Sequence, residues 1–338
     1  MSAVAKVRIQ TRRCVEVAEH IRAHGGVPSD VEDPMPYMFP VRIAHNGWCA
    51  TVAINQQTTP VVGPALRGTV YGEERRGWDY LLQKAIYEAN RNDEMFTVPW
   101  LCAVTPSMLR SLYHDIKTGD TLNQIEQRAE LLRDLGNMFS KNNWQSVNEI
   151  YEEADGFILR SDGKGIGQVL SMARAYQDPV QKKLFYFLAI MRNQGFWQYR
   201  DPLNLSAPVN YHEQRGHLRL GTIVIEDAEL KNLIRGRNNI QEEDDIEIRL
   251  AVRRAIEFIA QYLDVTPSAM HYYFWNHIRN CCNRDNPHCS SCENSCKLPE
   301  RYRSNDMTQC VFSSTCPSAN LPLSEKFIEP RIDHTIWQ

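Results

Sequence analysis

The cysteines of this chain are concentrated near its C-terminal end, and this clustering constrains the fold more than any other feature. Seven of the ten cysteines lie between positions 281 and 316, whereas Cys14, Cys49 and Cys102 are scattered. The first ten residues contain few apolar side chains and do not resemble a signal peptide, so we expect a cytoplasmic protein with reduced thiols. Clustered thiols in a reducing compartment usually bind metal, and scattered ones are usually small core residues.

Four of the clustered cysteines have the spacing of metal ligands. Cys282, Cys289 and Cys292 form a C-x6-C-x2-C run, and Cys296 follows after three more residues. The short gap makes a tight knuckle and the longer gap loops around it, so the thiolates converge on one centre. The predicted cofactor is a [4Fe–4S] cluster, with zinc as the alternative, and a structural role is favoured over a redox one. Spare candidates for the fourth ligand or a second site are Cys281, Cys310 and Cys316.

Length and charge narrow the function classes. The chain has 338 residues, enough for two domains, and no run of about 18 apolar residues that would span a membrane. Its 38 Lys and Arg against 41 Asp and Glu give a formal charge of −3, whereas proteins that bind duplex DNA usually carry a basic surplus. The balance favours a small or localised anionic ligand.

The hydrophobic periodicity predicts a mainly α fold in three regions. These are an N-terminal helix with an irregular or short-strand segment (1–75), a helical core (76–280) and a Cys-rich loop with its tail (281–338). Short strands are predicted at 41–43 and 50–54, and a central buried helix at 182–191. Other predicted helices cover residues 77–90, 124–139, 147–153, 169–176, 248–263 and 270–279, and one starts at Thr105-Pro106.

Three short resemblances point to one superfamily. The aromatic helix with Tyr273-Phe274-Trp275, followed by the C-x6-C-x2-C run, resembles the iron–sulfur loop of helix-hairpin-helix DNA glycosylases of the endonuclease III type, although their last gap is five residues rather than three. Lys182-Lys183 and Pro208-Val209-Asn210 resemble motifs of archaeal 8-oxoguanine DNA glycosylases. The likeness to queuosine salvage proteins, which are queuosine 5′-phosphate N-glycosylases, spans roughly residues 75 to 280 and rests on segments 77–81, 125–136, 247–249 and 274–275.

The resemblance implies a two-lobed helical fold with a C-terminal metal or iron–sulfur loop, and cleavage of a base–sugar bond. That reaction needs a carboxylate near the anomeric carbon, and bifunctional members add a lysine nucleophile. Asn210 stands where the carboxylate is expected, and an amide has no charge and cannot act as a base. Either the chain is an inactivated variant, or it is a binding protein that does not cut, or another carboxylate acts instead. The carboxylates nearest in sequence are Asp201, Glu213 and Asp178.

Lys183 is the candidate nucleophile or phosphate ligand, with a helix-start lysine as the structural alternative and Lys164 in the Gly-rich turn as runner-up. Predicted base-binding and phosphate-binding side chains are Phe196, Trp197, Tyr211, His212, Arg215 and Trp78. Arg215 belongs to a basic strip with His217 and Arg219, for which a solvated face is the alternative.

The leading hypothesis is an N-glycosidase for a modified purine or 7-deazaguanine nucleotide. The alternatives are a DNA glycosylase of the 8-oxoguanine type, which would make nucleic acid the partner, and a non-catalytic protein that binds a modified base in a bacterial defence or deazaguanine operon. A weaker reading is a structural metal protein whose cysteine end docks a partner.

Overall fold

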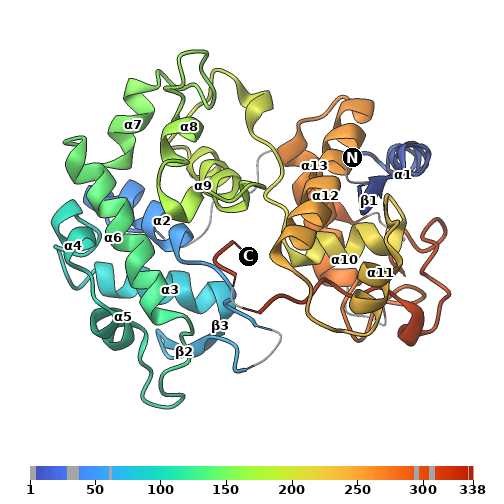
Figure 1. Cartoon of the computed structure of the whole chain (residues 1–338), viewed down its shortest axis with the longest axis horizontal. Coiled ribbons are helices and arrows are strands. Elements are labelled where there is room, and N and C mark those ends of the chain that lie inside the picture. The colour runs from blue at the N-terminus through green and yellow to red at the C-terminus, as the bar shows by residue number, and fades with distance from the viewer. Residues whose placement is uncertain are drawn as a thin grey trace. The chain divides into compact units, whose positions relative to one another are not determined.

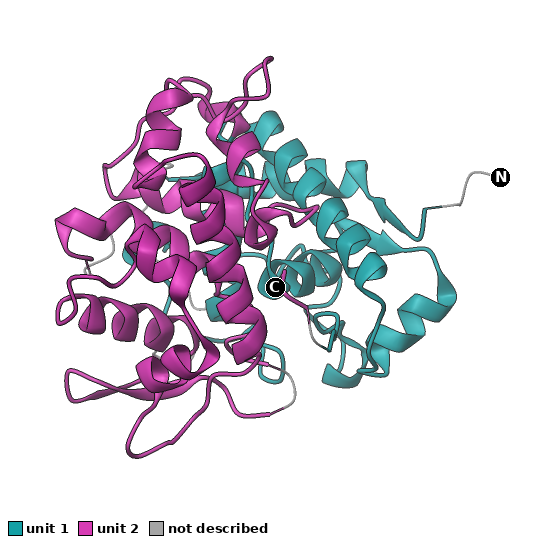
Figure 2. Cartoon of the chain, turned by 60° about the vertical axis from the view of Figure 1, so that its left-hand side comes forward, with its two compact units in different colours: residues 1–32, 205–333 teal, residues 33–204, 334–338 magenta. Residues whose placement is uncertain are grey.

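The computed structural model describes residues 5–28, 38–60, 63–292, 297–303, 309–333 and 335–337. These residues form a mainly helical structure (Figure 1). They contain thirteen α-helices and two small antiparallel sheets of two strands each. The mainly α fold class is therefore confirmed. The chain divides into two compact units, residues 1–32 with 205–333 (unit 1) and residues 33–204 with 334–338 (unit 2), coloured separately in Figure 2.

Unit 1 joins an N-terminal segment to a long segment from the second half of the chain. Strand β1 pairs antiparallel with β4, so that Val7 lies opposite Ile225 and Ile9 opposite Ile223. The unit is built around the long helix α12, whose buried face contacts α1, α13 and both strands. Its elements are β1 (Val7–Ile9), α1 (Thr11–Ala23), α10 (Tyr211–Leu220), β4 (Ile223–Ile225), α11 (Ala228–Arg235), α12 (Glu242–Leu263) and α13 (Pro267–Cys281).

Helix ends in unit 1 follow local sequence signals. Thr266 caps α13, because its hydroxyl accepts the Ala269 N–H at 3.1 Å and Pro267 occupies the first helical position. Four acidic residues at 242–245 fill the first turn of α12, where negative charge interacts favourably with the helix dipole. The apolar residues of α12 recur at helical spacing and are fully buried at Ile248, Val252 and Ile259.

Helix α9 belongs to the core of unit 2, with Leu184, Phe187 and Met191 buried. Helix α2 packs against α9, α3, α6 and α7, and the β2–β3 hairpin leads directly into α3. The elements are α2 (Ala44–Ala53), β2 (Arg67–Val70), β3 (Glu73–Arg76), α3 (Gly77–Ala89), α4 (Val98–Ala103), α5 (Pro106–Tyr113), α6 (Ile125–Lys141), α7 (Val147–Glu153), α8 (Ile166–Leu170) and α9 (Lys182–Asn193).

Several predicted elements are confirmed and some are wrong. Helices α3, α6, α7, α9 and α13 lie where the periodicity placed them, and α5 starts after Thr105 as expected. Helix α12 is also present but starts at Glu242 rather than near residue 248. The two short strands predicted at 41–43 and 50–54 are wrong, because these residues form a 3-10 turn and the buried helix α2. The single helix predicted at 169–176 is instead the end of α8 and a separate 3-10 turn at Arg174–Tyr176. The two units also divide the chain differently from the predicted boundaries at 75 and 280.

Gly216 allows α10 to lie close to α13. A Cβ atom at this position would stand 2.1 Å from Cδ1 and 2.5 Å from Cγ1 of Ile278. Because two of the atoms within 3 Å of it lie near the branch point of the isoleucine, the side chain cannot avoid the added methyl group by a small shift.

We expect Gly216→Ala to destabilise the protein by about 1–3 kcal/mol, as overpacking of a core does. Alanine is otherwise the better helix former by about 1 kcal/mol, so without the clash the substitution would stabilise. Urea denaturation measures the change. Combining Gly216→Ala with Ile278→Ala should cost less than the two separate effects together, because the methyl group then has space. A stabilised Gly216→Ala protein would contradict the close packing of α10 on α13.

Candidate functional site

Helix α10 begins with a capping box that fixes the position of Asn210. The Asn210 Oδ1 accepts the His212 N–H at 2.8 Å, and the Glu213 carboxylate accepts the Asn210 N–H at 3.1 Å. Glu213 is fully buried and also pairs with His271 Nδ1 at 2.6 Å. The side chain expected to carry the chemistry therefore stands at a helix N-terminus, next to a buried glutamate.

Two aromatic rings follow Asn210. The rings of Tyr211 and His212 are half-buried, with their centroids 4.1 Å apart. Burial, reinforced by the neighbouring Arg215 guanidinium, lowers the pKa of His212 to about 3, so this imidazole is neutral at pH 7. Arg215 Nη2 lies 2.9 Å from His212 Nδ1 and can only donate, so Nδ1 is the acceptor and the ring proton is on Nε2.

Arg215 and Arg219 connect α10 to two distant segments of unit 1. Arg215 donates to the Cys282 carbonyl at 2.8 Å and forms an ion pair of 2.8 Å with Glu329. Arg219 donates to the carbonyls of Asn283, Arg284 and Phe327 at 2.8, 3.0 and 2.6 Å. Both arginines are 2% exposed and His217 is fully buried, so the predicted basic strip is not a solvated face.

Glu329 is the carboxylate of this network. It is 3% exposed and accepts from Arg215 and from Arg284, whose side chain is one-third exposed. Burial on its own would raise the pKa of Glu329, but the guanidinium groups of Arg215 and Arg284 outweigh burial and hold that pKa at about 2. Two arginines thus share one ionised glutamate, which leaves an excess of positive charge beside the Tyr211 and His212 rings.

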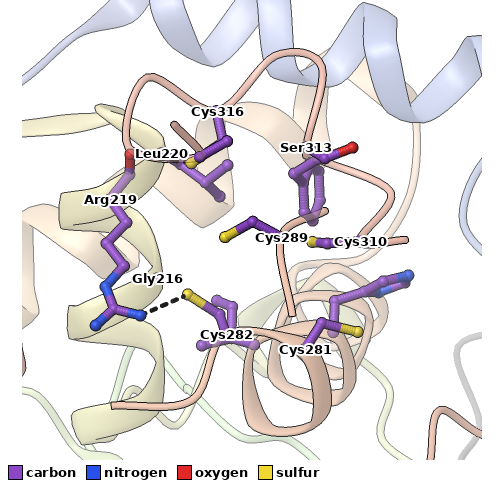
Figure 3. Close-up of a pocket in the computed structure, with 13 residues that line it drawn as sticks. Gly216, Arg219, Leu220, Cys281, Cys282, Cys289, Cys310, Ser313 and Cys316 are labelled. Atoms are coloured by element: carbon purple, nitrogen blue, oxygen red, sulfur yellow. Dashed lines mark hydrogen bonds between the residues drawn. The ribbon is translucent and has the colours of Figure 1, made fainter. Parts of the chain in front are cut away.

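The C-terminal half of α10 lines a pocket formed by thiols, which we call the thiol pocket. Cys281, Cys282, Cys289, Cys310 and Cys316 line it together with Gly216 and Arg219 (Figure 3). In Figure 3 the sulfur atoms of Cys282, Cys289 and Cys316 point toward the side of α10. The sulfur of Cys310 points toward Cys289, and the sulfur of Cys281 points away from α10. Three separate chain segments therefore bring their cysteines together.

The sulfur atoms in the thiol pocket contact cationic side chains. Arg219 Nη1 lies 3.3 Å from Cys282 Sγ, and Lys326 Nζ lies 3.6 Å from Cys289 Sγ. Burial raises the pKa of the Cys316 thiol to about 12 and also raises that of Cys289, with neighbouring thiols adding to both effects. Among the residues that the structure describes, no three His, Cys, Asp or Glu side chains are already arranged to hold a metal ion.

The predicted ligand set overlaps the thiol pocket only in part. Cys282 and Cys289 line the pocket, but Cys292 does not, and Cys296 lies outside the described residues. Cys310 and Cys316, predicted only as spare ligands, line it instead. The sequence spacing identified the cysteine-rich segment but could not show that the chain returns to it after residue 309.

Lys183 belongs to unit 2 and is fully buried. Its Nζ donates to the Ala53 carbonyl at 2.6 Å and to Gln56 Oε1 at 2.9 Å, at the C-terminal end of α2. Arg128, also fully buried, donates to the carbonyls of Ile54 and Gln56 at the same helix end. In this geometry Lys183 neutralises helix carbonyls that would otherwise be unsatisfied. Its predicted catalytic role stays a prediction.

The other predicted binding side chains of unit 2 lie in packed surroundings. Trp197 is 1% exposed, stacks on Tyr151 with centroids 4.8 Å apart, and donates to Asn148 Oδ1 at 2.8 Å. Phe196 is half-buried against His45, and Trp78 packs edge-on against Tyr186. Trp197 is thus a core residue, whereas Phe196 and Trp78 keep part of their surface exposed.

The three carboxylates named as replacements for Asn210 all have structural hydrogen bonds. Asp178 accepts the N–H groups of Val180 and Lys182 at the start of α9. Asp201 accepts those of Ile158 and Leu159. Glu213 is the one that lies beside Asn210 in the same unit and the same helix turn.

A search of protein-family models and of curated proteins found no match to this chain. None of the described helices combines the length and apolarity needed to cross a membrane. Sequence reasoning did not find Glu329 and Arg284 as partners of α10, or Lys326 as a partner of the thiol pocket. They lie in segments without periodicity, and their roles depend on contacts with residues 37 or more positions away.

The Glu329 ion pairs make a prediction about acid stability. Because the folded pKa of Glu329 is below its unfolded value, its contribution is full above about pH 4.5 and is lost as the pH falls toward 2. We expect Glu329→Gln to cost about 3–5 kcal/mol at pH 7, since it leaves two buried or half-buried cations without their counter-charge. Urea unfolding between pH 2 and 7 measures both effects.

Glu325→Gln is the matched control, because Glu325 is exposed in the same segment. Its unfolding free energy should stay within about 0.5 kcal/mol of the unchanged protein. If Glu329→Gln and Glu325→Gln showed the same stability and the same pH profile, the network would not have the assigned role.

Proposed function

We propose that the chain has the site of an N-glycosidase of the helix-hairpin-helix type for a modified purine or 7-deazaguanine nucleotide, and that it cleaves poorly as given because Asn210 replaces the expected aspartate. The observation that carries the proposal is the N-terminal turn of α10. There Asn210, the half-buried rings of Tyr211 and His212, and a cluster of arginines lie together. The mainly helical fold and the short sequence resemblances support the same superfamily.

A planar base has two kinds of partner at this turn. The Tyr211 and His212 rings offer an aromatic face, and base stacking on such rings is worth about 1–3 kcal/mol. The neutral His212 ring carries its proton on Nε2, so it is a hydrogen-bond donor for a ring nitrogen or carbonyl of the base. An imidazole that remains neutral across the physiological range keeps this donor pattern constant.

The excess positive charge beside the Tyr211 and His212 rings can bind the phosphate of a nucleotide. Arg284 shares Glu329 with Arg215 and is one-third exposed. Arg279 is exposed, stacks on Trp275 at 4.8 Å, and acts electrostatically on Tyr211 and His212 together with Arg215 and Arg284. Guanidinium groups bind phosphate oxygens with two parallel hydrogen bonds, so Arg279 and Arg284 are the proposed phosphate ligands.

The base–sugar bond breaks through an oxocarbenium-like state, which a carboxylate stabilises. Asn210 cannot supply the negative charge, so the protein with asparagine binds its nucleotide without efficient cleavage. Aspartate and asparagine are equally good N-caps, so Asn210→Asp preserves the capping box while adding one carboxylate oxygen. Glu213 is the replacement carboxylate if the chain as given does cleave, because it is hydrogen-bonded to the Asn210 N–H.

We expect Asn210→Asp to release base at least about 100-fold faster than the chain as given, within the range of positioned acid–base catalysis. The assay is base release followed by mass spectrometry. Its panel contains queuosine 5′-phosphate, the nucleoside, 8-oxoguanosine and DNA with 8-oxoguanine. Asn210→Ser is the matched control, since serine caps the helix but brings no charge. If the serine variant released base as fast as the aspartate variant, residue 210 would have no part in the chemistry.

A binding protein that does not cleave is the second candidate, and it is favoured because Asn210 Oδ1 and both Glu213 carboxylate oxygens already accept hydrogen bonds within the protein. It predicts tight nucleotide binding by calorimetry with no base release from either variant.

A DNA glycosylase of the 8-oxoguanine type is the alternative in which nucleic acid is the substrate. It predicts a gel shift at low salt that weakens steeply as salt is added, because phosphate contacts dominate such binding. No gel shift at low salt would exclude it.

A further inference from the structure

Two buried cations in unit 1 lack a carboxylate partner among the described residues. Arg219 is 2% exposed and Lys326 is 8% exposed. Besides the carbonyls already described for Arg219, and those of Ser318 and Ala319 for Lys326, their remaining contacts are cysteine sulfurs. A buried charge is costly unless an opposite charge lies nearby. The groups that can supply negative charge here are the thiols of the thiol pocket.

Four thiols lie around one pocket, where a local shift can bring them to one centre. Cys282, Cys289, Cys310 and Cys316 line the same pocket, and their sulfur atoms are turned toward α10 or toward one another (Figure 3). Cys281 also lines the pocket and its thiol is hydrogen-bonded to that of Cys310, but its sulfur points away from α10 and from Cys282, so it is left out of the set. Cys292 is left out because it does not line the pocket. The chain order of the set is C-x6-C-x20-C-x5-C, which joins the loop after α13 to the segment 310–316.

We propose that Cys282, Cys289, Cys310 and Cys316 bind one thiophilic metal centre, with Arg219 and Lys326 as the cations that balance its charge. Four thiolates around a dication leave two negative charges, which match the two buried cations. Metal binding deprotonates coordinating thiols, so the centre itself converts the thiols into the missing counter-charges. Zinc and an iron–sulfur cluster both use four thiolates, and the experiment below distinguishes them.

Closure of the site requires a local rearrangement. In the structure the sulfurs of Cys282 and Cys289 contact Arg219 and Lys326, and the Cys316 thiol donates to the Arg219 carbonyl at 3.3 Å. The sulfurs must move toward one another to reach metal-bonding distance, while both cations remain as second-sphere donors to the ligand sulfurs. The bound centre then fixes the segment 310–316 to the end of α13. This inference does not depend on the proposed glycosidase activity.

Differential alkylation of the full, unchanged chain tests the ligand set. The protein is purified without oxygen and treated with iodoacetamide, with and without a strong chelator, and each cysteine is quantified by mass spectrometry. We expect the chelator to raise labelling of Cys282, Cys289, Cys310 and Cys316 by about tenfold or more, because bound thiolates are protected. Labelling of Cys292 and Cys102 should not change. Protection of Cys292 in place of Cys310 and Cys316 would overturn the proposal.

Metal content identifies the centre and checks the same ligands independently. Zinc without acid-labile sulfide indicates a zinc site, and iron with sulfide indicates a cluster. Cys310→Ser and Cys316→Ser should each lose most of the metal, whereas Cys292→Ser and Cys102→Ser should keep it. The proposal would be overturned if the purified protein contained neither zinc nor iron. It would also be overturned if Cys310→Ser and Cys316→Ser kept all of their metal. If a serine variant fails to fold, the alkylation result on the unchanged chain decides.

Lys326→Gln tests the role of the cations. Loss of a second-sphere partner typically weakens metal affinity by about 10–100-fold, and we expect a change in that range. Competition with a chelator of known affinity measures it, and the exposed Lys141→Gln is the control. If Lys326→Gln and Lys141→Gln bound the metal with equal affinity, Lys326 would have no role at the metal centre.

Discussion

The architecture of unit 1 depends on two buried arginines one turn apart in α10. Arg215 and Arg219 donate to four carbonyls and one carboxylate, in segments that the chain reaches only 60 or more residues later. Each buried hydrogen bond from a charged donor is worth about 1.5–3 kcal/mol, and loss of a partner costs more. The tail after residue 309 has little regular structure of its own, so these contacts help to position it, together with those of Arg13 to Thr315 and His20 to Val311.

The charges of buried cations are compensated by different groups in the two units. In unit 2, Lys183 and Arg128 face the free carbonyls at the end of α2, so partial charges of the helix end compensate them. In unit 1, Arg215 has the ionised Glu329, whereas Arg219 and Lys326 face sulfur. Arg219 and Lys326 also donate to carbonyls, but they are the two of these five cations that in addition contact cysteine sulfur, beside the thiol pocket.

Local sequence signals predicted the helices well where periodicity or a cap was strong. Helix α7 was predicted with its observed bounds, and α6 and α9 within two residues at each end. Helix α2 was mistaken for strands, because it is buried almost all round and an apolar run has no readable period. Strand β1 was missed, since three residues carry no pattern and its partner lies more than 200 positions away. The candidate site, too, was predicted only where the signal was local in the sequence. Spacing found Cys282 and Cys289, but only the folded chain brings Cys310, Cys316 and Glu329 to α10.

The central claim is that α10 joins the aromatic turn at its N-terminus to the thiol pocket at its other end. Hydrogen–deuterium exchange on the metal-loaded full chain, before and after chelation, tests this most directly. The account predicts that chelation raises exchange in residues 282–289 and 310–329 and also in the first turn of α10, because Arg215 and Arg219 hold these segments as one unit. Faster exchange confined to the cysteine segments, with the Asn210 turn unchanged, would contradict it.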